Sequence, residues 1–177
     1  RDIMIPLVPM FHAHGWSLPY MATLLGCNQV YPGKFEVSSF LELIKKEKAP
    51  KQGGFMQCVP TMLDMIVSHP DIAQYKEVLQ GIIYEAGGSR LPKRLALKAK
   101  ELGIDLCAGW GMTEIYTKVA LQFLKPHMFN WSEDQKLDFL TRTGMAVPLV
   151  EQRVVDPKGN DVPANGRSIG EIILRAP

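Results

Sequence analysis

The chain has 177 residues, of which 46% are hydrophobic and 21% are charged, and its net charge is +2. This size and composition are ordinary for a globular protein with one large domain, or one domain and part of another. The charge is nearly balanced and no lysine- or arginine-rich run occurs, so nothing favours a nucleic-acid partner. No apolar segment is long enough to span a bilayer.

The first part of the chain alternates short apolar runs with helical patterns. The apolar run at residues 3–8 predicts a buried strand. Residues 10–16 are expected to form the loop at the end of this strand. Residues 17–25 are apolar enough to predict a buried helix, which a glycine ends. A second strand is expected at residues 28–31.

The next segment predicts an amphipathic helix. Apolar side chains recur at helical spacing over residues 37–44. Ser39 and Glu42 fit a capping box at the start of this helix. Three lysines near its end suit the helix dipole and predict a solvated face. They are Lys45, Lys46 and Lys48.

Two further strand–helix pairs follow. The strand at residues 55–59 precedes an apolar helix that Pro60 opens. The strand at residues 82–86 precedes a helix that Pro92 opens and Gly103 ends. Because strands and helices alternate, we expect right-handed βαβ units that build a parallel sheet.

The last third of the chain has a different character. Ser132 and Gln135 fit the capping box of a short helix that reaches about Leu140. Beyond it the chain predicts strands, including residues 150–155 and 170–175. The predicted fold class is therefore α/β, a parallel sheet flanked by helices and followed by a small β-rich segment.

We divide the chain accordingly into two parts. Residues 1–125 form a parallel α/β part that carries the ligand-binding loops. Residues 126–177 form a linker helix and the start of a β-rich part.

The strongest functional pattern is the stretch from Asp105 to Glu114. An apolar run breaks at Gly109-Trp110-Gly111, and Thr113 and Glu114 follow at once. The glycines let a backbone approach a ligand closely, and Trp110 can stack on a planar ring. Thr113 can hydrogen-bond a phosphate oxygen, and Glu114 can supply an oxygen ligand to Mg²⁺. The alternative is a strand-end turn with a core tryptophan and a helix-capping threonine.

Three loops are expected to share one edge of the sheet. They comprise residues 12–16, 87–89 and 109–114. Each follows a predicted parallel strand, and ligands bind where such strands end. His12 and His14 would need further ligands to hold a metal, so a structural role is favoured for His14.

The order of motifs resembles that of the adenylate-forming acyl-CoA synthetases, most closely the medium- and long-chain fatty acid–CoA ligases. Five segments carry the resemblance: PMFHAHGW, GGSRLP, GWGMTE, TGMAVP and GEIILRAP. It implies that a carboxylate attacks the α-phosphate of ATP, with Mg²⁺ present, to give an acyl-adenylate and pyrophosphate. The thiol of coenzyme A would then attack the acyl carbon.

The resemblance also implies a role for each matching residue. Trp110 would stack on adenine, Thr113 would contact the α-phosphate, Glu114 would hold Mg²⁺, and His12 would lie near the reacting carboxylate. His12, Thr113 and Glu114 are thus the predicted catalytic residues. Other contacts to the nucleotide would come from Gly87, Gly88, Ser89, Gly109, Gly111 and Met112. The acyl tunnel would be lined by His12, Trp16, Gln57, Val59 and Gly109. For Trp16, a place in the core is the alternative.

Some family motifs have no match in the 177 residues. They are the Ser/Thr/Gly-rich phosphate loop with its lysine, the ribose-binding aspartate, and the mobile C-terminal domain with its catalytic lysine. The resemblance therefore implies an internal segment of the large N-terminal part of the enzyme, inactive by itself.

Two other functions stay open. One is an adenylating enzyme for aryl or amino acids, which a charged residue lining the acyl pocket would favour. The apolar Met62 and Leu63 instead favour a hydrocarbon substrate. The other is a non-catalytic binding module that keeps the fold.

Cysteine usage predicts the compartment. Cys27, Cys58 and Cys107 are far apart and odd in number, which indicates reduced, buried thiols in a cytoplasmic protein. The expected partners are the small-molecule substrates. Peripheral membrane contact stays open, and an open sheet edge or exposed apolar surface would favour a homodimer.

Overall fold

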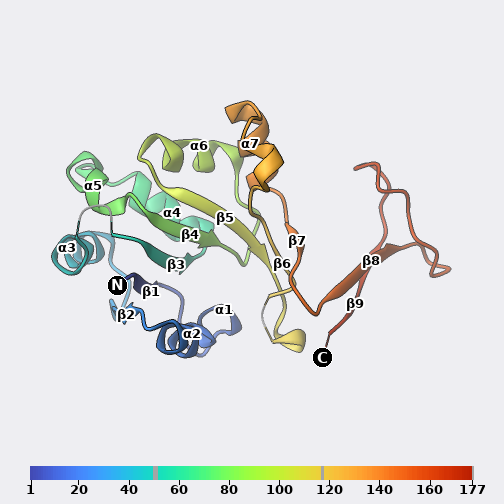
Figure 1. Ribbon diagram of the computed structural model, residues 1–177, viewed down its shortest axis with the longest axis horizontal. Helices are drawn as coiled ribbons and strands as arrows, with labels where there is room; N and C mark the ends of the chain where they lie inside the picture. The colour runs from blue at the N-terminus through green and yellow to red at the C-terminus, as the bar shows by residue number, and fades with distance from the viewer. Residues whose placement is uncertain (50–51, 117, 177) are drawn as a thin grey trace.

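The computed structural model describes residues 1–49, 52–116 and 118–176 (Figure 1). Its main feature is a seven-stranded sheet with the strand order β2-β1-β3-β4-β5-β6-β7. Strands β1 to β5 pair in parallel, whereas β6 and β7 add an antiparallel edge. The strands are β1 (Ile3–Pro6), β2 (Asn28–Gln29), β3 (Gly54–Cys58), β4 (Ile82–Ala86), β5 (Asp105–Trp110), β6 (Ala120–Leu121) and β7 (Met145–Ala146).

Helices cover both faces of this sheet, which confirms the predicted α/β class. Figure 1 shows α4, α5 and α6 on one face and α1 and α2 on the other. The α-helices are α1 (Ala13–Trp16), α2 (Leu18–Leu25), α3 (Val37–Glu47), α4 (Pro60–Val67), α5 (Lys76–Leu79), α6 (Lys93–Glu101) and α7 (Glu133–Leu140). Short 3₁₀ turns occur at η1 (Ile72–Tyr75), η2 (Thr113–Ile115) and η3 (Pro126–Met128).

The hydrophobic core lies mainly on one side of the sheet. Successive side chains of a strand point to opposite faces, and the large core cluster takes alternate residues of the central strands. It also takes the apolar stripes of α3, α4 and α6. Its strand members include Ile3, Ile5, Met56, Cys58, Ile82, Tyr84 and Ala86. On the other side, Met4, Leu18 and Ala22 form a second, smaller buried cluster.

Several predicted helix ends are confirmed. Pro60 occupies the first turn of α4. Gly26 ends α2 in the left-handed conformation, at φ 65°. Ser132 and Gln135 form both hydrogen bonds of the capping box of α7, and this helix ends at the predicted Leu140.

The predicted cap of α3 is wrong. The Glu36 carboxylate accepts hydrogen bonds from the backbone N–H groups of Ser38, at 3.1 Å, and Ser39, at 2.7 Å. The helix therefore begins three residues before the predicted box, and Glu42 instead accepts a hydrogen bond from the Tyr75 hydroxyl.

The predicted solvated lysine face of α3 is also wrong at Lys48. This side chain is only 2% exposed, and its Nζ donates to the carbonyl oxygen of Gln80 at 2.9 Å. A distant backbone carbonyl replaces water as the partner of its charge.

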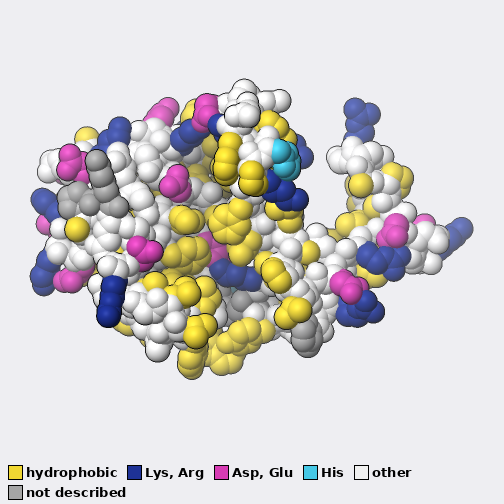
Figure 2. Space-filling view, viewed as in Figure 1, with side chains coloured by type: hydrophobic (Ala, Val, Ile, Leu, Met, Phe, Trp, Pro, Cys, Tyr) yellow, Lys and Arg dark blue, Asp and Glu magenta, His cyan; other side chains and the backbone are white. Residues whose placement is uncertain are grey.

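The segment after β1 departs from the prediction in two ways. The expected strand-end loop contains a helical turn, α1, and α2 is not buried all round. Leu18 and Ala22 face the sheet, but Leu24 is 86% exposed. Figure 2 shows the hydrophobic side chains that gather over this part of the surface.

The last residues form a separate hairpin. Strands β8 (Glu151–Val155) and β9 (Glu171–Arg175) pair antiparallel with each other. Strand β7, by contrast, pairs with β6 in the main sheet, so the main sheet takes strands from both before and after residues 126–143. The division of the chain at residue 125 stays a prediction. No helix in the described ranges is long and apolar enough to cross a membrane.

Candidate functional site

The three predicted loops meet at one edge of the sheet, beyond the ends of β1, β4 and β5. There they enclose a cavity of about 230 Å³, named here the inner cavity. Loop residues far apart in sequence therefore form one wall, as the parallel topology predicted. The inner cavity is lined by His12, Ala13, His14, Glu85, Gly87, Gly88, Gly109, Trp110, Gly111, Met112, Thr113 and Lys118.

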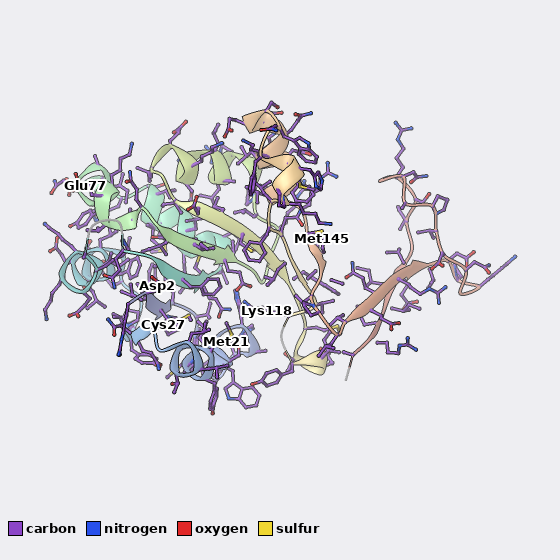
Figure 3. All side chains as sticks on the ribbon, in the orientation of Figure 1. Asp2, Met21, Cys27, Glu77, Lys118 and Met145 are labelled. Atoms are coloured by element: carbon purple, nitrogen blue, oxygen red, sulfur yellow. The ribbon has the colours of Figure 1, made fainter. Side chains whose placement is uncertain are left out.

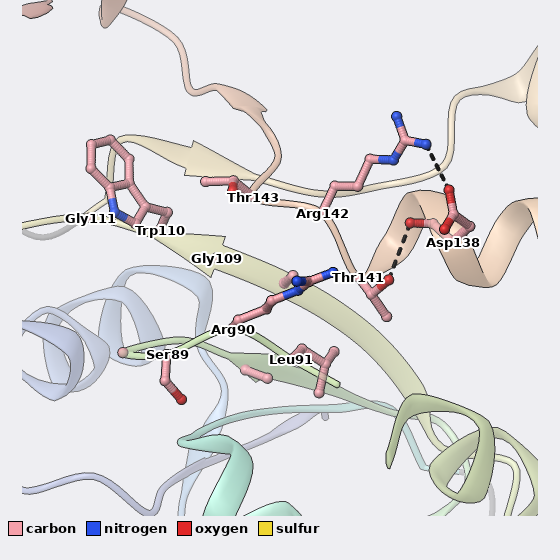
Figure 4. A pocket seen from close by; sticks show the side chains of 13 residues that line it. Ser89, Arg90, Leu91, Gly109, Trp110, Gly111, Asp138, Thr141, Arg142 and Thr143 are labelled. Atoms are coloured by element: carbon pink, nitrogen blue, oxygen red, sulfur yellow. Dashed lines mark hydrogen bonds and ion pairs between the residues drawn. The ribbon is translucent and has the colours of Figure 1, made fainter. Parts of the chain in front are cut away.

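A larger cavity of about 740 Å³, named here the outer cavity, adjoins it (Figure 4). Four residues line both cavities, namely Gly88, Gly109, Trp110 and Gly111. The remaining wall of the outer cavity consists of Ala86, Ser89, Arg90, Leu91, Ala108, Asp138, Thr141, Arg142 and Thr143.

Two glycines are required where the strands end. A Cβ atom at Gly109 would lie 2.5 Å from Glu85 Oε1, and one at Gly87 would lie 2.9 Å from His14 Cε1. These positions therefore hold glycine because buried side chains lie directly against the backbone. The sequence argument had assigned the glycines to close approach of a ligand.

A cluster of four polar side chains lies at the floor of the inner cavity, and we call it the polar cluster. Glu85 is its centre and is 2% exposed. Its Oε2 accepts a hydrogen bond from Gln57 Nε2 at 2.8 Å and pairs with the Lys118 ammonium. Its Oε1 lies 3.3 Å from His14 Nε2. One carboxylate thus joins β3, β4, α1 and the segment before β6.

Burial changes the protonation of this cluster. It lowers the pKa of His14 from 6.5 to about 4, with a smaller contribution from the charge of Lys118. His14 is therefore neutral near pH 7. Burial also lowers the pKa of Lys118 from 10.5 to about 7.

The sequence prediction missed Glu85 and Lys118. A signal for Glu85 was present, since it is a charged residue inside an apolar strand, directly before the Gly87 loop. For Lys118 no comparable pattern exists, because its partner lies 33 residues away in the sequence.

His12 lies in the inner cavity, as predicted. Its Nδ1 accepts a hydrogen bond from the backbone N–H of His14 at 3.1 Å and so caps α1. Trp110, Met112 and Thr113 line the same cavity. Ser89 lines only the outer cavity.

Glu114 follows Thr113 in the exposed turn η2 and does not line either cavity. Within the described residues, no group of three or more His, Cys, Asp or Glu side chains could hold a metal ion. The magnesium role of Glu114 stays a prediction.

The residues predicted for the acyl tunnel are only partly brought together. His12 and Gly109 line the inner cavity. Gln57 is fully buried and does not line it, but its Nε2 donates to the carboxylate of Glu85, which does. Val59 precedes α4 and does not line the cavity. Trp16 is 50% exposed, and its ring packs against Tyr116 with centroids 5.1 Å apart. It therefore belongs neither to the core nor to a cavity wall.

Two arginines on the outer cavity were not predicted. Arg142 Nη2 lies 2.6 Å from the Asp138 carboxylate. Arg90, in the segment after β4, lines the same cavity (Figure 4). Asp138 lines the cavity as well and offsets the charge of Arg142, so Arg90 is the arginine of this wall that carries no described ion pair.

Comparison with known proteins bears on this site. The family model described as AMP-binding enzyme matches residues 1–177. The chain belongs to this family. It is 35% identical to a long-chain-fatty-acid–CoA ligase of Thermus thermophilus, covering 100% of this chain and 32% of the relative. It is 28% identical to a medium-chain-fatty-acid–CoA ligase of Ectopseudomonas oleovorans, covering 99% of this chain and 32% of the relative.

Solved structures of this family share the fold. The N-terminal domain of FACL13 from Mycobacterium tuberculosis superposes with a TM-score of 0.79 at 18% identity, covering 99% of this chain and 41% of that one. A long-chain-fatty-acid–CoA ligase of Archaeoglobus fulgidus gives a TM-score of 0.73 at 21% identity, covering 99% and 34%. The chain thus spans about a third of the length of the curated relatives it matches.

Proposed function

We propose that this chain forms the adenylate- and acyl-binding part of an AMP-forming fatty acid–CoA ligase. The full-length protein would join a fatty acid to AMP from ATP and then transfer the acyl group to coenzyme A. The observation that carries this proposal is that the inner and outer cavities adjoin each other at Trp110, which lines both. One is large enough for a nucleotide base and ribose, and the other is lined by His12 and Thr113.

Adenine would occupy the outer cavity in this proposal. Trp110 would stack on the base, and the Gly87–Ser89 loop with Gly109, Gly111 and Met112 would surround the nucleotide through backbone groups. The shared lining of the two cavities by Gly88, Gly109, Trp110 and Gly111 supports this placement.

The reacting groups would meet in the inner cavity. The Thr113 hydroxyl would donate to an α-phosphate oxygen, and His12 would orient the carboxylate that attacks. His12 Nδ1 already accepts a backbone hydrogen bond, so its Nε2 would be the nitrogen that faces the substrate. Positioning and charge neutralisation supply most of the rate of such transfers.

Magnesium, with Glu114 as its protein ligand, belongs to the same proposal. Mg²⁺ keeps several waters and usually binds through one or two carboxylates together with substrate phosphates. The exposed carboxylate of Glu114, one residue after Thr113, meets that need. When bound, Mg²⁺ would neutralise negative charge on the triphosphate.

Several further expectations belong to the same proposal. The 177-residue chain alone should not turn over ATP, and the full-length protein would act in the cytoplasm. Cys58 and Cys107 are free and buried, as predicted, whereas Cys27 is only half-buried, which corrects the prediction for that residue. Burial raises the pKa of the Cys58 thiol to about 12 and that of the Cys107 thiol to about 11. A homodimer and peripheral membrane contact stay predictions.

Trp110→Ala in the full-length protein tests this proposal. Loss of a stacking aromatic costs about 1–3 kcal/mol per base, so the KM for ATP should rise about 5- to 150-fold. The KM for the fatty acid should change much less. Trp131→Ala is the matched control, since Trp131 lines neither cavity.

Equal effects of Trp110→Ala on both substrates would contradict the adenine assignment. If the full-length protein bound ATP but released no pyrophosphate with any acid, the non-catalytic binding module would be favoured instead.

A further inference from the structure

Two charged residues line the inner cavity, Glu85 and Lys118. A charged acyl pocket would favour the aryl or amino acid alternative, but these two side chains pair with each other and so offer little net charge to a ligand. The argument from Met62 and Leu63 for a hydrocarbon does not hold either, because both residues belong to the large core cluster or pack against it, and neither lines the cavity. The contacts of the polar cluster indicate a role other than the choice of acyl group.

His14 connects Glu85 to the predicted catalytic histidine. Its Nε2 lies 3.3 Å from Glu85 Oε1, and both ring nitrogens are buried and closed to a ligand. The backbone N–H of His14 donates to His12 Nδ1 at 3.1 Å. The position of the buried His14 ring therefore fixes the start of α1 and, with it, the orientation of the His12 ring.

Lys118 connects Glu85 to the loop that carries Thr113. This loop leaves β5 at Trp110 and returns where the backbone N–H of Val119 donates to the Trp110 carbonyl oxygen at 2.9 Å. Lys118 directly precedes this bond and pairs with the Glu85 carboxylate. Figure 3 shows Lys118 near the end of the sheet, where it lines the inner cavity. The ion pair thus anchors the returning end of the loop to β4.

The same loop contains a residue in an unfavourable backbone conformation. Tyr116 has a φ of 56°, in the left-handed region that residues other than glycine rarely adopt. Its backbone N–H donates to the Thr113 carbonyl oxygen at 3.2 Å, and its ring packs against Trp16 at the end of α1. Such a turn persists only where its surroundings hold it in place. The anchor at Lys118 is one of these surroundings.

The remaining loop, at residues 87–89, touches the polar cluster as well. A Cβ atom at Gly87 would meet the His14 ring, and one at Gly109, directly before Trp110, would meet the Glu85 carboxylate. All three loops of the site therefore lie against Glu85 or one of its partners.

We propose that Glu85 is a positioning residue of the ligase reaction, which holds His12 in place through His14 and Thr113 through Lys118. This inference rests on the proposed function, because the roles of His12 and Thr113 belong to it. A buried carboxylate suits this task, since its two oxygens accept partners from separate loops at the same time. The transfer of AMP depends on positioning, and a displacement of about 1 Å is enough to lower such a rate about 100-fold.

The test uses the full-length protein with ATP, coenzyme A and Mg²⁺, and pyrophosphate release as the signal. The substrate is whichever of hexanoate, decanoate and palmitate gives the highest kcat/KM. Glu85→Gln/Lys118→Met removes both charges together, so no buried ion is left without a partner, but the anchor of the loop is lost. We expect kcat to fall at least about 10-fold, with a change of less than about 3-fold in the KM for ATP.

Leu63→Ala is the matched control for lost stability. Leu63 lies in the large core cluster and lines neither cavity, so this variant weakens the fold without releasing the loops. Its kcat should equal that of the wild type at a temperature where it stays folded. Lys118→Met provides the same kinetic readout if the double variant does not fold.

Hydrogen exchange measured by mass spectrometry gives a readout that does not depend on turnover. The backbone N–H groups of Ile115, Tyr116 and Val119 are hydrogen-bonded within the loop. Peptides that cover them should exchange at least about 10-fold faster in the double variant than in the wild type, because the loop opens locally more often. In Leu63→Ala their exchange should not change.

The outcomes separate the two proposals. A wild-type kcat in the folded double variant, or unchanged exchange in the loop, would overturn the positioning role and leave the ligase proposal standing. A KM for ATP that rises as much as kcat falls would overturn it too, because the ion pair would then support the adenine site. Absence of pyrophosphate release with every acid would refute the ligase proposal and the catalytic role of Glu85 with it, while hydrogen exchange would still decide whether the ion pair holds the loop.

Discussion

The two faces of the central sheet differ in chemistry, although the same strands supply both. On one face, Ile82 and Tyr84 of β4 enter a large apolar cluster beneath α4 and α6. On the other, Glu85 of the same strand reaches the polar cluster and the inner cavity. The first face contributes most of the hydrophobic core, and the second carries the polar cluster beneath the inner cavity.

The difference shows how a buried charge is tolerated next to a hydrophobic core. Tyr84 and Glu85 are neighbours in sequence, yet the pleat places them on opposite sides. Glu85 is stabilised there by Gln57, by Lys118 and by the nearby His14. Removing one member of the Glu85–Lys118 pair should therefore lower the free energy of unfolding more than removing both charges together.

Removal of a single partner tests the polar face and should give the largest effect. Glu85→Ala leaves Lys118 buried without its counter-ion, and breaking such a pair costs about 3–5 kcal/mol of unfolding free energy. The double variant Glu85→Gln/Lys118→Met should cost less than about 1 kcal/mol. Urea denaturation followed by circular dichroism measures both. Equal losses in the two variants would show that the ion pair does not set the stability of this face.

Deletion of core volume tests the apolar face. Leu63 is fully buried, and Leu63→Ala should lower the unfolding free energy by about 3 kcal/mol through lost transfer energy and a residual cavity. Ile83 is 37% exposed and lies on the other face, so Ile83→Ala should cost about 1 kcal/mol or less. Thermal denaturation of both variants gives the comparison. Similar losses would mean that the two faces contribute alike.

Acidification should weaken the polar face selectively, with a smaller effect. The pKa of His14 is about 4 in the fold and 6.5 when unfolded, so the unfolded chain binds more protons between these values. Stability should therefore fall as the pH decreases from 6.5 to 4, by on the order of 2 kcal/mol from this residue. Above pH 6.5 His14 has no such effect.

His14→Asn is the variant that isolates this contribution. Urea denaturation at several pH values should show a shallower acid decline than in the wild-type chain. Superimposable pH profiles of the two chains, apart from a constant offset, would rule out His14 as the group responsible.

Much of the fold could be predicted because it depends on local patterns. The alternation of apolar strands and helices predicted the parallel sheet, and Ser132 with Gln135 predicted the start of α7. The three site loops were predicted to share one edge of the sheet because each directly follows a predicted parallel strand. Parallel strand ends must meet on the same side, so this inference needed no side-chain detail.

Errors arose where the alternatives were locally equivalent. Ser39 and Glu36 both offer a side chain at the start of α3, and only the path of the preceding residues selects Glu36. The apolar residues of α2 matched a buried helix, but whether Leu24 is covered depends on which elements lie beside it. A hydropathy pattern shows which side chains are apolar, but it does not show which other elements pack against them.

The sequence alone determined the class of fold, the family resemblance and the residues of the strand-end loops, because each depends on order along the chain. Only the tertiary structure decided that Glu85 meets Lys118 and His14, and that Gly87 and Gly109 must lack a side chain beside them. Ion pairing and steric contact act across space between residues distant in sequence. The polar chemistry of the inner cavity therefore depends on the pairing of the strands, which brings these side chains together.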